Sequence, residues 1–371
     1  MSSRSIPPEI CGMICQDEIL TRGDLRVLCG VSRSFRDESE RLLYVNIILR
    51  SFRYLKSWCS SLSRRPHLGN RIMKMTITMP PQTDIEADDL GKIVAAFRKC
   101  TKLRELEILS DGMKTLPGDA VNAWILLGHP FRLTKFTNTY FQANLLVDFL
   151  KEQTELQVLS MRPKEKIIVN LPDDTLLNLS TIDASAAIMR DLGSGLWNPQ
   201  NVKHLQYHLW RSTDEDELRT FVALVPFARI LKSLSVQRTE AAAGLDIAIL
   251  VSCIAAQVPD LKYLRVLDYS RVPLDASVPL LPFPIRFNCL EILILKPMTR
   301  VTLDGDDVTA FADLRGPISR FLTASRIMDS MPCLKRLVLI TCANYSFRRL
   351  QDGNIETEGA VSLDDEEWMK Q

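Results

Sequence analysis

The chain has 371 residues, a formal net charge of +1, 25% charged residues and 46% hydrophobic residues. This length can hold two or three domains, and the composition is typical of globular proteins rather than disordered chains. A net charge near zero provides little attraction to nucleic acid or to an anionic membrane surface, so the sequence predicts neither partner.

Two features bear on where the protein works. The amino terminus has no apolar run of signal-peptide length, and the longest apolar stretch, residues 245–258, is too short to cross a bilayer and contains Asp246. We expect that stretch to form a core-facing helix. The nine cysteines lack the spacing of a disulfide framework, which indicates reduced thiols and a cytoplasmic or nuclear location.

Residues 6–44 predict three short helices. Each starts with proline in its first turn or with a side chain that can cap the first N–H groups. The starts are Pro7 and Pro8, then Thr21 or Asp24, then Ser32, and the apolar residues that follow at helical spacing are Ile10, Met13 and Ile14, then Leu25 and Leu28, then Phe35, Leu42 and Leu43. A helical patch of about 40 residues usually needs a disulfide, a metal or a partner. No disulfide or zinc spacing is present, so we expect a partner to cover its apolar stripe.

The ordered set Ile6-Pro7-x-Glu9-Ile10, Ile14, Asp24-Leu25-x-x-Leu28 and Val31-Ser32-Arg33-x-Phe35 resembles an F-box. It departs from the usual pattern in its leading Ile6 and in the polar sequence CQDE after Ile14. The resemblance implies that residues 1–50 bind a Skp-type adaptor. The residues placed at adaptor contact, or in the helix packing behind it, are Ile6, Pro7, Ile10, Ile14, Leu25, Leu28 and Val31. The alternative is a helical cap that merely closes the amino-terminal end of the following repeats.

From residue 51 onward one phrase returns: an apolar residue, two others, an apolar residue, one other, and an apolar residue. Its later positions predict a short strand with one buried face, and the segments between copies have helical spacing. The eight clear copies begin at Ile72, Leu103, Leu156, Val202, Leu231, Leu261, Leu290 and Leu334. Between them, residues 83–97 predict a helix with Leu90, Ile93, Val94 and Phe97 on one face, and residues 213–228 predict one with Leu218, Phe221, Val222 and Val225 together.

Alternation of strand and return helix at a regular period is how solenoid repeats stack. The phrase resembles the leucine-rich repeat, although the Asn or Cys that normally follows the strand is matched only by Cys342. The resemblance implies an α/β fold: a three-helix F-box followed, over residues 51–349, by an irregular leucine-rich-repeat solenoid with a curved parallel sheet and helices on its convex side. The alternative is an ordinary α/β domain with similar strands.

Side chains between the buried positions of each strand would line the concave face of such a solenoid. Apolar clusters that include an aromatic residue or arginine are where binding energy concentrates. We therefore expect a protein substrate, or the acidic tail in its place, to contact Tyr263, Arg265, Ile292, Ile294 and Arg336. The alternative is that these strands are covered on both sides by local structure.

Residues 350–371 form an acidic tail with a single aromatic residue, Trp368. One interpretation is a solvated, partly disordered end. The other is that Trp368 docks on the last strands as a cap.

No pattern in the sequence predicts catalysis, a cofactor or a metal. His204 and His208 have the spacing of a zinc pair, but they fall on a predicted strand and no catalytic glutamate follows His204. Cys11 and Cys15 lie one helical turn apart without a second pair of ligands. Glycine patterns for a nucleophile elbow, a Walker loop or a dinucleotide site are absent from the sequence.

Together, the two resemblances imply a non-catalytic substrate-recognition subunit of a Skp–cullin–F-box ubiquitin ligase. The F-box would bind the Skp-type adaptor and, through it, a cullin-RING ligase, while the solenoid captures an unknown protein substrate. Such a subunit acts by raising the effective concentration of the acceptor lysine at the ubiquitin-loaded enzyme. The alternative is a leucine-rich-repeat scaffold or docking protein with no role in ubiquitin transfer.

Overall fold

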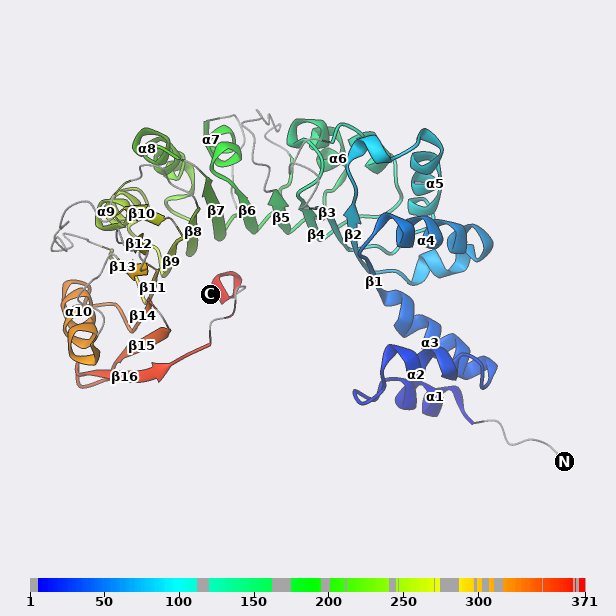
Figure 1. Ribbon diagram of the computed structural model, residues 1–371, viewed down its shortest axis with the longest axis horizontal. Helices are drawn as coiled ribbons and strands as arrows, with labels where there is room; N and C mark the ends of the chain where they lie inside the picture. Colours follow the sequence, from blue (N-terminus) through cyan, green and yellow to red (C-terminus); the bar gives the residue numbers. More distant parts are fainter. Residues whose placement is uncertain are drawn as a thin grey trace. The chain divides into compact units, whose positions relative to one another are not determined.

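The structure, a computed structural model, describes residues 6–111, 120–161, 175–194, 201–210, 212–239, 245, 247–269, 271–273, 287–296, 299–301, 307–309, 316–341, 343–362, 364 and 367–370. Cys342 lies outside these residues. The chain forms two compact units, Met1–Leu156 and Gln157–Gln371. Both units are α/β, with mostly parallel strands and return helices on one side of them (Figure 1). The expected α/β class and parallel strands are therefore confirmed.

The first unit opens with three helices and continues with alternating strands and helices. Strands β1 to β4 are neighbours in chain order, and their three pairings are parallel. The elements are α1 (Pro8–Cys15), α2 (Arg22–Leu28), α3 (Arg33–Val45), β1 (Asn46–Leu49), α4 (Phe52–Arg64), η1 (Pro66–Arg71), β2 (Lys74–Met79), η2 (Gln82–Asp84), α5 (Ala87–Phe97), β3 (Glu105–Ser110), η3 (Ala123–Leu126), β4 (Lys135–Asn138), η4 (Ala143–Leu146) and α6 (Val147–Glu152).

The repeated phrase explains the register of these strands. Met75 on β2 lies opposite Leu106 on β3, and Leu106 lies opposite Phe136 on β4. All three side chains are buried, as is the anchor Leu103 that precedes β3. Each copy of the phrase therefore places its apolar residues in one continuous row beneath the return helices, where burial stabilises the neighbouring copy.

The second unit continues the pattern and ends with antiparallel strands. In the order β5-β6-β7-β8-β9-β11-β14 the described pairings are parallel, and β15 and β16 then add antiparallel. The elements are β5 (Val158–Met161), β6 (Thr181–Ser185), α7 (Ala186–Ser194), β7 (His204–Trp210), α8 (Asp214–Val222), η5 (Val225–Phe227), β8 (Ser233–Thr239), α9 (Ile247–Gln257), β9 (Tyr263–Asp268), β11 (Ile292–Lys296), α10 (Pro317–Ser330), β14 (Arg336–Ile340), β15 (Asn344–Arg349), β16 (Ile355–Ala360) and η7 (Glu367–Met369). A small separate sheet joins β10 (Arg271–Pro273), β12 (Thr299–Val301) and β13 (Asp307–Thr309).

Two of the predicted helices are confirmed. Helix α5 buries Leu90, Ile93 and Phe97, and α9 is the core-facing helix expected from the apolar stretch at residues 245–258. No helix among the described residues has both the length and the apolar character needed to cross a bilayer. The cysteines in this part of the chain are free thiols.

The predicted buried face of the helix at residues 213–228 is wrong. Helix α8 buries Phe221, but it turns Glu217 and Thr220 inward with it, while Leu218 and Val222 are exposed. The inward glutamate is stable there because a buried arginine on β8 pairs with it. From hydrophobic periodicity alone, a glutamate is assigned to the solvent-facing side of a helix. The arginine that pairs with Glu217 is 21 residues later, outside the helix pattern.

Candidate functional site

Local hydrogen bonds set the limits of the three amino-terminal helices. Pro8 is the first residue of α1, where it removes an N–H group that has no helical partner. Thr21 and Asp24 form a capping box at the start of α2, with Thr21 N donating to Asp24 Oδ2 at 2.8 Å and Asp24 N donating to Thr21 Oγ1 at 3.3 Å. The Thr21 hydroxyl is the main cause of a lowered pKa at Asp24. Ser32 caps α3 by accepting from Phe35 N at 3.3 Å, so all three expected helices and their starts are confirmed.

The inner faces of these helices make a small core. Cys11 and Cys15 of α1 are buried against Leu25 of α2 and Phe35 of α3. Partly buried residues complete it: Leu20, Leu28, Leu42 and Leu43. Cys15 Sγ also lies 3.4 Å from Ser39 Oγ. These cysteines act as small core residues, so their spacing on α1 follows from packing.

The outer faces carry an apolar surface that the described part of the chain leaves exposed. On α1, Ile10, Met13 and Ile14 are 44%, 70% and 40% exposed. The further exposed apolar residues are Ile6, Pro7, Val27 and Val31. We name these seven residues the amino-terminal apolar surface. An exposed apolar patch beside polar residues is typical of a protein-binding surface.

Of the seven residues predicted for adaptor contact or for the helix packing behind it, five belong to this surface and two lie behind it. Ile6, Pro7, Ile10, Ile14 and Val31 are exposed. Leu25 is buried and Leu28 packs against the same small core, so these two residues support the helices from behind. The prediction missed Val27, although its position between Leu25 and Leu28 on a short helix places it on the outer face.

A shallow hollow of about 440 Å³ adjoins this surface between α1 and α3. Its lining residues are Pro8, Glu9, Gly12, Met13, Gln16, Glu38 and Arg41. Arg41 Nε donates to Glu38 Oε2 at 2.8 Å. The hollow therefore combines one apolar side, Met13, with a charged rim, which suits a partner that inserts an apolar side chain and pairs polar groups around it.

The residues predicted to bind a substrate lie on one face of the second unit's sheet. Tyr263 on β9 is opposite Ile292 on β11, which is opposite Arg336 on β14, and Arg265 is opposite Ile294 in the next row. The structure therefore brings all five predicted residues together.

Of the two occupants expected from the sequence, a protein substrate or the acidic tail in its place, the structure has the chain's own end on this face. Trp368 is 2% exposed and belongs to one buried cluster with Tyr263, Leu267, Ile294 and Val338. Ile292 is partly buried against the same cluster, and Arg336 Nη1 lies 3.4 Å from Glu367 Oε1. Element η7 contacts β8 and β9 on the face opposite the return helices (Figure 1). Of the two interpretations of the tail, the structure has the docked one.

Beneath the tail runs a row of polar residues that the cover does not fully pair. His204, Ser233 and Tyr263 are directly opposite one another on β7, β8 and β9. His204 forms a hydrogen bond with the backbone of Trp368. Among the described residues, no partner is found for three buried atoms: His204 Nδ1, Ser233 Oγ and Tyr263 Oη. Burial lowers the pKa of His204 and raises that of Tyr263. We name these three residues the unpaired row.

The next row on the same face is polar and better connected. Arg265 donates to Ser235 Oγ at 2.9 Å and to Gln206 Oε1 at 2.8 Å. Gln206 in turn donates to Asp183 Oδ1 at 3.2 Å, and His208 Nε2 lies 2.8 Å from the same oxygen. Arg265 is therefore a buried member of a network that links neighbouring strands, not a free arginine on an open surface. His208 belongs to this network, which explains its place on the strand without a metal.

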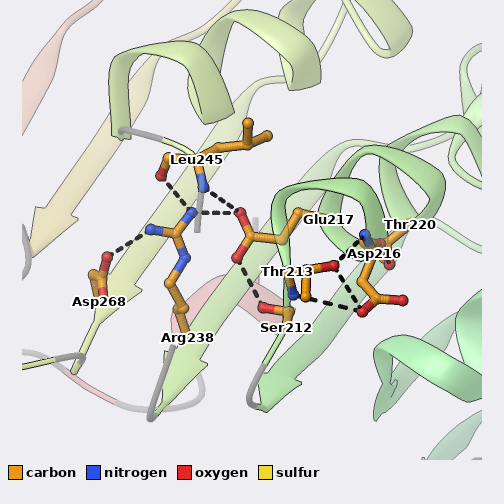
Figure 2. Close-up of polar contacts among 8 residues, drawn as sticks. All are labelled: Ser212, Thr213, Asp216, Glu217, Thr220, Arg238, Leu245 and Asp268. Atoms are coloured by element: carbon orange, nitrogen blue, oxygen red, sulfur yellow. Dashed lines mark hydrogen bonds and ion pairs between the residues drawn. The ribbon is translucent and has the colours of Figure 1, made fainter. Parts of the chain in front are cut away.

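A cluster of buried charges lies on the helix side of β8 and β9 (Figure 2). Arg238 Nη2 lies 2.7 Å from Glu217 Oε2, and Arg238 Nη1 lies 2.8 Å from Asp268 Oδ2. Ser212 Oγ and Leu245 N also donate to the Glu217 carboxylate, at 2.8 and 3.0 Å. Burial raises the pKa of Glu217, and Arg238 opposes that rise. These side chains are sealed from solvent, so the cluster serves to fix α8 and the start of α9 on the sheet.

No protein-family model matches the chain, and no curated protein matches it significantly.

Proposed function

We propose that the protein is the substrate-recognition subunit of a Skp–cullin–F-box ubiquitin ligase. The amino-terminal apolar surface would bind a Skp-type adaptor, and the repeat region, resembling leucine-rich repeats, would hold a protein target. The chain would carry out no chemistry itself. Its contribution would be to keep an acceptor lysine of the target close to the ubiquitin-loaded enzyme, which raises the effective concentration of the reacting groups.

The observation that best supports this proposal is that some apolar residues of α1 and α2 form a small core while others on the same helices are exposed. Cys11, Cys15 and Leu25 stabilise the helices from inside. Ile10 and Ile14, on the other side of α1, are 44% and 40% exposed. Full burial of such a side chain is worth about 1.5–3 kcal/mol, so a partner that covers the exposed part of each would gain somewhat less than half of that. A short helical domain that leaves this much apolar surface uncovered is better suited to binding another protein than to closing its own fold.

The experiment is a binding titration of the purified chain against a Skp-type adaptor. Ile10→Glu and Ile14→Glu should each weaken binding by about tenfold or more, because a charge would be buried in an apolar contact. Leu145→Glu is the matched control: it places the same charge on an exposed leucine of η4 in the same unit. Leu25 is unsuitable for this test, since a charge in the small core would unfold the helices.

Two results would reject the proposal. One is adaptor binding that is unchanged in Ile10→Glu and Ile14→Glu while both variants keep the wild-type helix content. The other is the absence of adaptor binding by the folded wild-type chain, which favours the scaffold alternative. Co-purification of a cullin with the wild-type chain, lost in both α1 variants and kept in Leu145→Glu, supports the ligase assignment.

A further inference from the structure

We infer that the face of the second unit's sheet across β7, β8, β9, β11 and β14 is a binding site for a protein segment in which an aromatic side chain follows acidic residues. The described end of the chain, residues 367–370, occupies this site as an exchangeable substitute. The inference rests on the proposed function, because it names the class of segment that the proposed receptor would capture.

The docked tail shows which chemistry the face accepts. The indole of Trp368 fills an apolar site formed with Tyr263, Ile294 and Val338, and Met369 packs at its edge. An apolar site that takes one large aromatic side chain is the usual form of a binding hot spot.

The positive charge of Arg336 indicates that a segment bound to this face is acidic. Arg336 lies beside this apolar site, with Nη1 3.4 Å from Glu367 Oε1 and Nε 3.8 Å from Glu358 Oε2. Residues 350–371 contain seven Asp and Glu residues and one Lys, so the segment that sits on this arginine is strongly acidic. An aromatic residue preceded by carboxylates is therefore the pattern that the face recognises.

The unpaired row offers an incoming segment hydrogen-bonding groups that the described part of the tail leaves unused. Permanently buried polar groups are almost always hydrogen-bonded. Under the tail, His204 Nδ1, Ser233 Oγ and Tyr263 Oη are buried with no hydrogen-bond partner in the described chain. A segment that covers the same face and also supplies partners to this row would bind more strongly than the tail does, since each unpaired buried group costs free energy.

Upstream of Trp368 the tail is held by the pairing of β16 with β15 and by the ion pairs of Arg336. Strand β16 is mostly exposed along its length, and the side chains of the Arg336 ion pairs are 20–30% exposed. Ion pairs at such partly exposed positions contribute less than the burial of a large aromatic side chain, so Arg336 selects an acidic segment while Trp368 supplies most of the affinity. Tethering to the same chain nevertheless gives the tail a high effective concentration, so it should compete with any partner.

The test uses a labelled synthetic peptide of residues 361–371 and two forms of the full-length chain. In the first form, Trp368→Ala and Glu367→Gln together prevent the chain's own tail from docking; the second form is the wild type. The peptide should bind the double variant at least about tenfold more tightly than the wild type, because only the variant offers a vacant face. The same peptide carrying Trp368→Ala should lose at least about tenfold in affinity.

The matched control is Glu356→Gln, which removes an exposed charge from β16 without touching the Trp368 contacts. Peptide binding to this variant should equal that of the wild type. Adding Arg336→Gln to the double variant should weaken peptide binding, because it removes the cation beside Glu367.

Equal peptide binding to the wild type and the double variant would overturn the inference, as would no binding to a double variant that keeps the wild-type melting transition. If the double variant does not fold, hydrogen exchange of the wild type alone still tests the inference. Excess unlabelled peptide should raise amide hydrogen exchange at residues 367–370, and unchanged exchange at peptide concentrations up to the solubility limit would also overturn it. Adaptor binding involves the other unit and is measured separately. Loss of adaptor binding would count against the proposed ligase role, whereas equal peptide binding to the two forms of the chain would count against this inference.

Discussion

The guanidinium of Arg238 and the carboxylate of Glu217 lie 2.7 Å apart, with side chains that are 1% and 0% exposed. Asp268 holds the other side of the same guanidinium at 2.8 Å. The three charges come from β8, α8 and β9 (Figure 2). Because both neighbours of Arg238 depend on it, this residue is the one whose loss should damage the second unit most.

We expect Arg238→Met to lower the free energy of unfolding by about 3–5 kcal/mol, since it removes the buried cation that pairs with Glu217. Urea unfolding of the full chain, combined with amide hydrogen exchange of β8 and β9, measures this effect. The control is Arg219→Met, which breaks an exposed pair with Glu215 on α8 and should change stability by less than about 1 kcal/mol. A change at Arg238 as small as that at Arg219 would contradict the structural role of the cluster.

The first unit contains a matched pair of glycines with opposite expectations. A Cβ atom on Gly69 would lie 2.4 Å from the carbonyl oxygen of Lys99, whereas one on Gly91 in α5 would meet nothing within 4 Å. Gly69→Ala should destabilise the unit by about 1–3 kcal/mol, because backbone atoms must move to accept the methyl group. Gly91→Ala should stabilise it by about 0.5–1 kcal/mol through helix propensity. Thermal unfolding of the two variants should show shifts of opposite sign.

Docking of the tail should weaken as the pH falls below the usual pKa of histidine. Burial under the tail lowers the pKa of His204 from its ordinary value of 6.5. Between 6.5 and that lower value the undocked state binds a proton that the docked state excludes, so the docked state loses stability as the pH drops through this window. Hydrogen exchange at residues 367–370, corrected for its intrinsic pH dependence, should therefore increase between pH 7.5 and pH 5.5.

His204→Gln is the control for this prediction, because glutamine does not titrate. Its tail should show the same protection at both pH values. If the wild type and His204→Gln respond to pH equally, a different group is responsible.

The thiols should differ sharply in reactivity. Burial raises the pKa values of Cys59 and Cys100 to about 12, so the reactive thiolate is scarce at these positions near pH 8. Cys289 and Cys333 are exposed. Intact-mass analysis with peptide mapping during iodoacetamide treatment should find Cys289 and Cys333 modified first, and Cys59 and Cys100 only on unfolding. Modification of Cys59 at the rate of Cys289 would show that α4 opens readily.

Much of the local structure could be predicted because it depends on neighbours in sequence. The spacing of Ile72, Met75 and Ile77 and of Leu103, Leu106 and Ile108 places buried rows on adjacent parallel strands. Helix starts at Thr21 and Ser32 follow from hydrogen bonds to N–H groups three residues later. Such contacts are complete within a few residues, so their pattern can be read before the fold is known.

Three features of the candidate sites could not be predicted in this way. Glu217 turns inward because of an arginine 21 residues later. The sequence left open whether Leu25 contacts a partner or packs behind that contact; it lies in the small core, while its near neighbour Val27 is exposed. The sequence also left open whether the tail is solvated or docked; Trp368 covers Tyr263 and Ile294.

By itself, the amino-acid sequence determined the parallel α/β repeats and the amino-terminal helices, since hydrophobic periodicity and helix capping act over one turn or one strand. Only the tertiary structure decided which faces remain exposed. That outcome depends on which distant residues pack on each surface, as Trp368 packs on the sheet of the second unit. Hydrophobic periodicity holds no information about such long-range contacts.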